Sequence, residues 1–248
     1  MTAKWEAQAL RATFFPTEAT AVAAEWWQEF TGSQPDNENR QPKDAIVVVS
    51  GAFEGAFLSI SSGIGRVDVV FQPLLPNQIN PLDGQTLPTV SVGPAEALFD
   101  KLFSRLRAVS ERLKLVNRVA LAGTLLKPVT SRDEAYEELK VLLKSVSVNP
   151  ARMRDLIYRV NWPTQDTAGR VVNRMGAWGS MTARVSAQGL GEAPTGSAIL
   201  SENHYVSFEF DFNTAPDPEV RFTPEEVTSE FQFLRGLLEE NLKQGEVI

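Results

Sequence analysis

An order of predicted elements occurs twice in this 248-residue chain, and the repetition restricts its fold more than any other pattern does. Ala9–Phe15 has the composition of a strand and is followed by Pro16 and an amphipathic helix. Ala120–Leu126 aligns with this segment, is followed by Pro128 and again leads into a helix. The two segments have Ala, Leu and Thr at the same three positions. Repetition of one supersecondary unit is the sequence signature of a duplicated fold.

Each repeat continues with three strand segments and a long amphipathic helix. Glycine-containing connections separate the first three of these strands, and short connections suit antiparallel hairpins because parallel strands need a long crossover. The closing helices begin at Pro94 and at Thr223-Pro224, residues that suit a first helical turn. We interpret the polar segment 31–44 as a loop. The predicted strands are residues 45–50, 56–61, 66–72, 155–162, 171–187 and 205–213.

These patterns predict an α+β fold made of two similar β-α-β-β-β-α halves, residues 1–115 and residues 116–248. Apolar and polar residues alternate in 66–72, which indicates a strand with one buried face and one solvated face. Antiparallel sheets with such strands are covered on one side only. We therefore expect one antiparallel sheet, or two related sheets, with the helices packed on one face.

Composition and charge exclude several classes of function. The chain has no cysteine and a single histidine, His204, which excludes disulfides, thiolate nucleophiles and metal sites built from several Cys or His ligands. Its formal net charge of -7 opposes binding to the phosphate backbone of nucleic acid. Neither a secretory signal nor an apolar run long enough for a membrane span is recognisable, so we expect a cytoplasmic protein without membrane contact.

Two motifs with catalytic associations are incomplete. Residues 191–197 have the glycine spacing of a phosphate-binding loop, but they lack its lysine and do not lead into a clear helix. We interpret them as a hairpin loop. His204 has no nucleophile elbow to work with, and we interpret it as a surface histidine. We therefore predict no catalytic residue, no metal site and no cofactor.

Two carboxylates project from one face of the last predicted strand. Glu209 and Asp211 alternate with Phe208, Phe210 and Phe212, and the phenylalanines are expected to face the core. Such a pair suits a divalent cation or acid–base chemistry, and it equally suits a solvated strand face. The sequence leaves both interpretations open.

The same polar face is expected to carry four further charged residues. Arg66, Asp68, Arg159 and Arg184 each alternate with apolar neighbours along their strands. A face of mixed charge is either a docking surface for a protein or a solvated surface whose ion pairs have small net value. We include all four among the candidate binding residues.

Trp26 and Trp27 are adjacent on the first predicted helix. Neighbouring helical residues point about 100° apart, so one ring is expected to lie at the edge of the core. Trp27 is our candidate for an exposed interface residue, because tryptophan is enriched in binding hot spots. The alternative is that the loop 31–44 covers this ring.

The second half resembles a sporadically distributed bacterial family of uncharacterised proteins of about this length. Two motifs carry the resemblance: Arg118-Val119-Ala120-Leu121, before a proline-capped helix, and Phe208-Glu209-Phe210-Asp211-Phe212, before the C-terminal helix. The resemblance implies a bacterial, cytoplasmic setting. It carries over no catalytic residue, because that family has no assigned chemistry.

The sequence is compatible with three functions. We favour a non-enzymatic interaction or scaffold protein that acts in a protein complex or as a homodimer. The first alternative is a metal-dependent hydrolase that uses the strand carboxylates Glu209, Asp211 and Asp68. The second is a small-molecule-binding protein whose ligand lies between the sheet and the helices.

Overall fold

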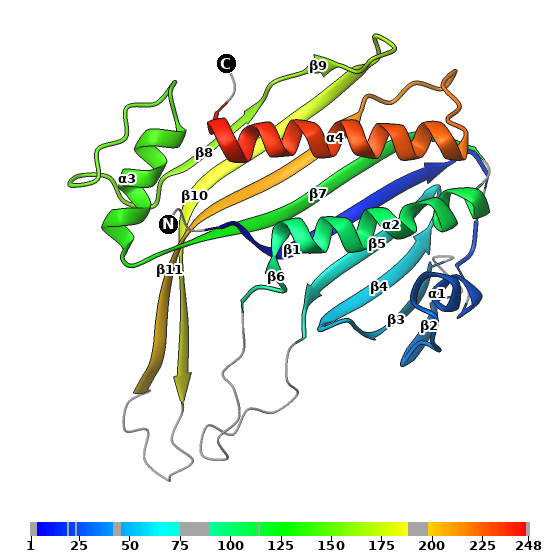
Figure 1. Cartoon of the computed structure of the whole chain (residues 1–248), viewed down its shortest axis with the longest axis horizontal. Helices are drawn as coiled ribbons and strands as arrows, with labels where there is room; N and C mark the ends of the chain where they lie inside the picture. The colour runs from blue at the N-terminus through cyan, green and yellow to red at the C-terminus, as the bar shows by residue number, and fades with distance from the viewer. Residues whose placement is uncertain are drawn as a thin grey trace.

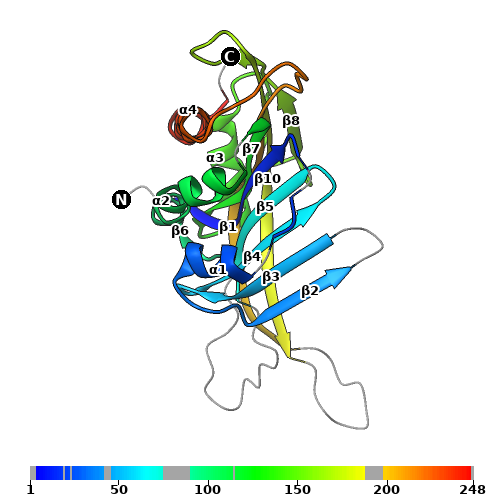
Figure 2. The same ribbon diagram turned by 90° about the vertical axis from the view of Figure 1, so that its right-hand side faces the viewer.

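The computed structural model describes residues 4–18, 20–22, 24–41, 46–74, 90–113, 115–187 and 198–246. These residues form four helices and one antiparallel sheet of 11 strands, which confirms the predicted α+β class. The helices lie on one face of the sheet (Figure 2). The opposite face, which no described helix covers, is called the open face below.

The chain orders its elements as follows. The strands are β1 (Glu6–Pro16), β2 (Asn37–Gln41), β3 (Ile46–Phe53), β4 (Ala56–Gly63), β5 (Arg66–Pro73), β6 (Gly93–Pro94), β7 (Val116–Val129), β8 (Ile157–Asn161), β9 (Thr164–Gln165), β10 (Val171–Ala187) and β11 (Ala198–Thr214). The helices are α1 (Ala24–Thr31), α2 (Ala95–Leu113), α3 (Arg132–Leu142) and α4 (Pro224–Gln244).

The strands pair in the order β2-β3-β4-β5-β1-β7-β11-β10-β8, with β6 beside β1 and β9 beside β10. Strands from the N-terminal part of the chain thus lie on one side of the β1–β7 pair, and strands from the C-terminal part lie on the other (Figure 1). The chain therefore builds one continuous sheet, with its first strand in the middle.

The central β1–β7 pair depends on a glycine. Arg11 of β1 lies opposite Ala122 of β7, and the next β7 residue is Gly123. A Cβ atom at Gly123 would lie 2.4 Å from the carbonyl oxygen of Ala9 and 3.0 Å from the ring of Phe210. A side chain at this position is therefore incompatible with the close approach of β1 and with the phenylalanine that packs over β7.

Helices α2 and α4 lie side by side over the middle of the sheet (Figure 1). Phe231 of α4 packs edge-on against Phe14 of β1, with ring centroids 5.1 Å apart. A capping box of Thr223 and Glu226 begins α4, and it satisfies backbone N–H groups that a helix start leaves unpaired. The buried residues follow helical spacing on both helices: Leu98, Leu102, Leu106 and Val109 on α2, and Val227, Phe231, Leu234 and Leu238 on α4.

The two shorter helices cover the outer strands. α1 packs against β3 and against α2, and α3 packs against β10, β11 and β7. Ser131 caps α3 by accepting a hydrogen bond from the backbone N–H of Glu134. Among the described residues, no helix combines the length and the apolar composition that a membrane span requires.

Two local predictions were wrong. The segment 31–44 contains β2, which pairs with β3 from Asn37↔Ser50 to Gln41↔Ile46. Every β2 residue is exposed, so the strand has no apolar alternation that would identify it. The first helix was predicted to follow Pro16 directly, but α1 begins only at Ala24. Thr17 lies outside the helix, and its backbone N–H bonds the carbonyl of Leu115 at 3.2 Å.

Candidate functional site

The open face carries a chain of charged and polar side chains across four neighbouring strands. Between β1 and β11, β7 contributes the small residues Ala120, Ala122 and Thr124 to this face, and Arg118 nearer its start. Because Ala122 is small, Arg11 of β1 reaches over β7 to Asp211 of β11, with Nη2 and Oδ2 3.5 Å apart. The open face therefore connects strands that are not direct neighbours.

Asp68 on β5 is the most enclosed carboxylate of this face, with 16% of its side chain exposed. Its Oδ1 accepts hydrogen bonds from Thr13 Oγ1 at 2.5 Å and from Arg66 Nη2 at 2.9 Å. Arg66 Nε lies 2.7 Å from its Oδ2, and Arg11 Nε lies 3.9 Å from Oδ1. Two guanidinium groups therefore neutralise this carboxylate.

Asp211 on β11 belongs to the same network. Asn213 Nδ2 donates to Asp211 Oδ1 at 2.8 Å, and Arg118 Nη2 donates to Asn213 Oδ1 at 2.8 Å. Arg118 also lies over the ring of Phe15, with its Cζ 4.7 Å from the ring centroid. Arg66, Asp68 and Asp211 therefore lie on one face, as their alternation predicts. Arg11 contacts both Asp68 and Asp211.

Arg159 and Glu209 lie on the open face but outside this network. Register places Arg159 of β8 and Glu209 of β11 on either side of Ala177. Both side chains are exposed, and neither forms an ion pair with another described residue. Glu209 and Asp211 thus point to the same face, but only Asp211 has a cationic partner there.

Arg184 does not lie on the open face. It shares its strand face with Trp178 and Arg174, which point toward the helices, because residues two apart on a strand lie on the same side. Arg184 Nε pairs with Glu202 Oε2 at 2.5 Å. The prediction that groups it with Arg66 and Arg159 is therefore wrong.

Trp27 does not lie on the surface either. It is 1% exposed, and Trp26 is 7% exposed. α1 has neighbours on two sides, β3 and α2, so two rings that point in different directions are both covered. Its burial removes Trp27 from the candidate binding residues.

The described residues contain no group of three or more His, Asp or Glu side chains arranged to hold a metal ion. In addition, Asp68 and Asp211 already contact arginines that a cation would have to displace. His204 contacts Thr182 at 3.1 Å and Glu202 at 3.3 Å on the helix-facing side of the β10–β11 hairpin. The predicted loop 191–197 lies outside the described residues.

Four residues of the open-face network were not predicted: Arg11, Thr13, Arg118 and Asn213. A signal existed for Arg11 and Thr13, because they alternate with Leu10, Ala12 and Phe14 on the first predicted strand. The contact between Arg11 and Asp211 depends on strand order, which no local pattern reveals.

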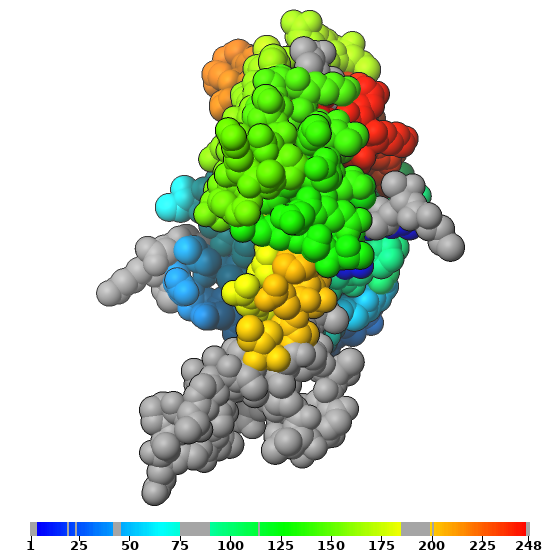
Figure 3. Space-filling model, turned by 90° about the vertical axis from the view of Figure 1, so that its left-hand side faces the viewer, coloured from blue at the N-terminus to red at the C-terminus, as the bar shows by residue number. Residues whose placement is uncertain are grey.

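The β10–β11 hairpin extends beyond the rest of the sheet (Figure 1). Pairing of β11 with β7 ends at His204↔Val129, and pairing of β10 with β8 ends at Gly179↔Ile157. From there to Ala187↔Ala198 the two strands pair only with each other among the described residues. We call residues 183–187 and 198–203 the ribbon. Figure 3 shows it, in yellow and gold, below the green surface around α3.

A separate polar cluster is buried between α4 and the β9–β10 turn. Arg170 Nε lies 2.5 Å from Asp166 Oδ2, and Arg170 Nη2 contacts Glu230 of α4. Burial would raise the pKa of Asp166, but hydrogen bonds from Arg170 and from the backbone of Ala168 bring it below its ordinary value. Burial raises the pKa of Glu230 to about 7; Arg170 opposes this rise and Asp166 adds to it. Glu230 Oε2 is buried without a hydrogen-bond partner among the described residues.

No family model matches the chain, and neither a curated protein nor a solved structure is detectably similar to it. The resemblance to a bacterial family therefore stays a prediction.

Proposed function

We propose that this chain is a non-enzymatic interaction protein, which joins a protein complex by pairing the ribbon with an extended strand of its partner. The observation that carries the proposal is a two-stranded extension whose outer edges are unpaired among the described residues. A two-stranded hairpin is only marginally stable in water, whereas three strands form a stable sheet. A partner strand at either edge would supply the third.

The ribbon has the properties of an edge that accepts a strand. Unpaired N–H and C=O groups along a strand are a template for another chain. Natural proteins often block such edges with lysine or proline, and residues 183–187 and 198–203 contain neither. Ile199 is 59% exposed, so it offers apolar area to a partner. One register shift, between Val185 and Ser186, interrupts the ribbon.

The open face supports the same function less well. Arg11, Arg66, Asp68 and Asp211 are partners of one another, so binding there would first have to break existing contacts. Exposed ion pairs of this kind contribute about 0–1 kcal/mol each, and they serve as a solvated surface without any partner. The ribbon, in contrast, has unpaired backbone groups to offer.

The test is an affinity pull-down from the native host, read by mass spectrometry, with three forms of the protein. The ribbon variant combines Ala183→Lys and Ile199→Lys, which places two charges on the edges. The matched control is Ile64→Lys, the same change at an 89% exposed position in the β4–β5 turn. We expect the ribbon variant to lose a partner that the wild type and the control both retain.

Two results would overturn this assignment. One is retention of every partner by the ribbon variant. The other is loss of the partner only when Arg66→Glu and Arg159→Glu are combined, which would assign the interface to the open face. The partner strand can come from a different protein or from a second copy of this chain. Light scattering on the purified protein distinguishes these cases, because a second copy gives a dimer that the ribbon variant does not form.

We also propose that residues 1–115 and 116–248 arose by duplication of one β-α-β-β-β-α unit. The strand order supports this. On one side of the central pair β1 is followed by β5 and β4, and on the other side β7 is followed by β11 and β10, so each half places its first strand in the centre beside its last long strand. An experimental structure in which β1-β5-β4 does not superpose on β7-β11-β10 would contradict the duplication.

A further inference from the structure

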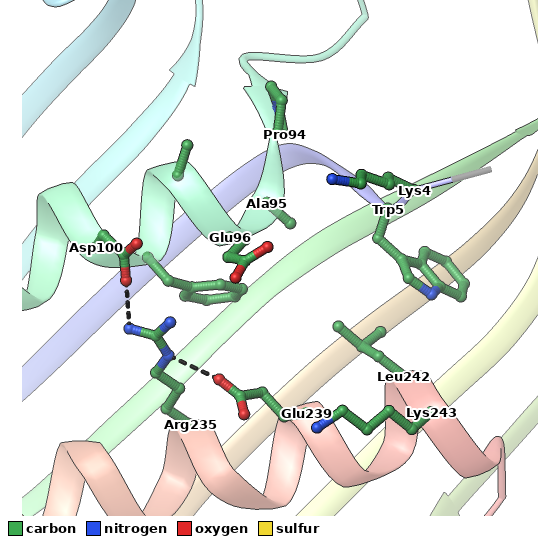
Figure 4. Close-up of a pocket in the computed structure, with 12 residues that line it drawn as sticks. Lys4, Trp5, Pro94, Ala95, Glu96, Asp100, Arg235, Glu239, Leu242 and Lys243 are labelled. Atoms are coloured by element: carbon green, nitrogen blue, oxygen red, sulfur yellow. Dashed lines mark hydrogen bonds and ion pairs between the residues drawn. The ribbon is translucent and has the colours of Figure 1, made fainter. Parts of the chain in front are cut away.

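A cleft of about 630 Å³ opens between the N-terminal turn of α2 and the C-terminal turns of α4 (Figure 4). Lys4 and Trp5, which directly precede β1, line one end of the cleft. The volume lies within the range of about 300–1,000 Å³ that is typical of small-molecule sites. None of the sequence-predicted site residues lines this cleft.

The floor of the cleft is apolar and rigid. Trp5 packs edge-on against Trp178 with ring centroids 6.0 Å apart, and its carbonyl accepts a hydrogen bond from Ala95 N–H at 3.0 Å. Phe99 is 3% exposed, and Leu242 of α4 lies below Trp5 (Figure 4). An aromatic ring laid on this floor would bury apolar area without displacing any hydrogen bond.

Of the six charged groups on the rim, some pair with one another and others have no ionic partner among the described residues. Arg235 donates to Asp100 at 2.7 Å and to Glu239 at 2.9 Å, so three of the six charged groups form one cluster. Lys4 and Lys243 are exposed and form no ion pair with any residue that the structure describes. Glu96 is the remaining carboxylate, in the first turn of α2. Lys4, Lys243 and Glu96 sum to +1 and the Arg235 cluster sums to -1, so the excess positive charge of the rim lies at the two lysines. The N-terminus of α2 adds a partial positive charge.

We propose that this cleft binds a small aromatic acid, with its ring against Trp5 and its carboxylate toward the rim lysines Lys4 and Lys243. An apolar pocket with a few convergent polar groups at its rim is the usual form of such sites. The lysines supply charge-assisted hydrogen bonds to the carboxylate. This ligand site is independent of the ribbon, and either assignment stands without the other.

Three probes with one ring and different head groups test the proposal by titration calorimetry: 2-naphthoate, 2-naphthamide and 2-naphthylmethylammonium. We expect 2-naphthoate to bind most tightly. Lys4→Gln with Lys243→Gln should weaken its binding about tenfold, whereas Lys140→Gln with Lys144→Gln on α3 and the segment after it should not. Ala97→Trp, an exposed lining position, should block the cleft and abolish binding.

The proposal fails if 2-naphthoate shows no saturable binding to the wild type. It also fails if 2-naphthylmethylammonium binds as tightly as the acid, because the cleft then does not select a negative charge. Unchanged affinity in the Lys4→Gln, Lys243→Gln protein, or in the Ala97→Trp protein, would place the bound acid elsewhere.

Discussion

Glu230 of α4 and Asp166 of the β9–β10 turn place their carboxylates against one guanidinium, that of Arg170. Both side chains are at least 95% buried. One cation does not neutralise two buried carboxylates, so the pair keeps a proton into the neutral range on Glu230, whose pKa is about 7.

Stability is therefore expected to fall as the pH rises through this range. The unfolded chain ionises Glu230 near pH 4.5, whereas the folded chain holds the proton until about pH 7. Unfolding releases a proton in that window, and the free energy of unfolding decreases by up to about 3 kcal/mol across it. Urea unfolding at pH 5 and pH 8 measures the decrease.

Glu230→Gln should remove this pH dependence. The amide is neutral at every pH, so the variant is expected to be more stable than wild type at pH 8 and similar to it at pH 5. Glu219→Gln, an exposed position in the segment before α4, is the control. A variant that is less stable than wild type at pH 8 would show that Glu230 is ionised in the folded chain.

Glu246 is expected to give the opposite pH dependence. Burial would raise its pKa, but hydrogen bonds from Tyr158 Oη and from the backbone N–H of Ser145 lower it. A lowered folded-state pKa stabilises the fold above the unfolded pKa, and this stabilisation is lost as the pH falls. Glu246→Gln should therefore cost about 1–2 kcal/mol at pH 7, with a smaller difference from wild type at pH 4. If the variant and the wild type differ in stability by the same amount at pH 7 and pH 4, the lowered pKa of Glu246 is contradicted.

Arg174 fastens β10 to the C-terminal turns of α4. Its side chain is 6% exposed, and it contacts Asn241 at 2.7 Å, the Leu237 carbonyl at 2.9 Å and Glu240 at 2.9 Å. Arg174→Met leaves the buried side-chain oxygen of Asn241 without this donor and removes the ion pair with Glu240, so we expect a loss of about 3 kcal/mol in thermal or urea unfolding. Arg159→Met, on an exposed arginine, should change stability by less than about 0.5 kcal/mol. Equal effects of the two substitutions would refute the role given to Arg174.

Two glycine-to-alanine substitutions should change the free energy of unfolding in opposite directions. At Gly123 the added methyl group meets the Ala9 carbonyl and Phe210, so Gly123→Ala is expected to destabilise the central pair by several kcal/mol. At Gly236, within α4, nothing lies within 4 Å, and Gly236→Ala should stabilise the helix by about 0.5–1 kcal/mol. Melting temperatures of the two variants and the wild type test both signs.

The sequence predicted what local patterns determine. Strands β3, β4 and β5 follow from apolar or alternating segments separated by glycine-containing turns, and α2 follows from its apolar spacing. It missed β2, because a strand without a buried residue has no alternation. Asp36 helps to hold that edge by accepting a hydrogen bond from Ala52 N–H at 2.8 Å, a contact that sequence spacing does not reveal.

The candidate site was less predictable for the same reason. Alternation placed Arg66, Asp68 and Asp211 on one face, but only strand order shows that Arg11 joins them across Ala122. Trp27 was misassigned because α1 is covered from two sides by elements distant in sequence. The cleft at Trp5 forms where α2, α4 and the residues before β1 come together, and no sequence motif predicts that arrangement.

The position of β1 in the middle of the sheet has a consequence for synthesis on the ribosome. Its partner β7 begins at Val116, so the nascent chain contains β1 to β5 and α2 before that partner has been translated. During this interval one edge of β1 has no strand beside it, and an uncovered edge is a template for aggregation. The yield of folded protein is therefore expected to depend on translation rate and on chaperones that shield nascent chains, even when the finished protein is stable.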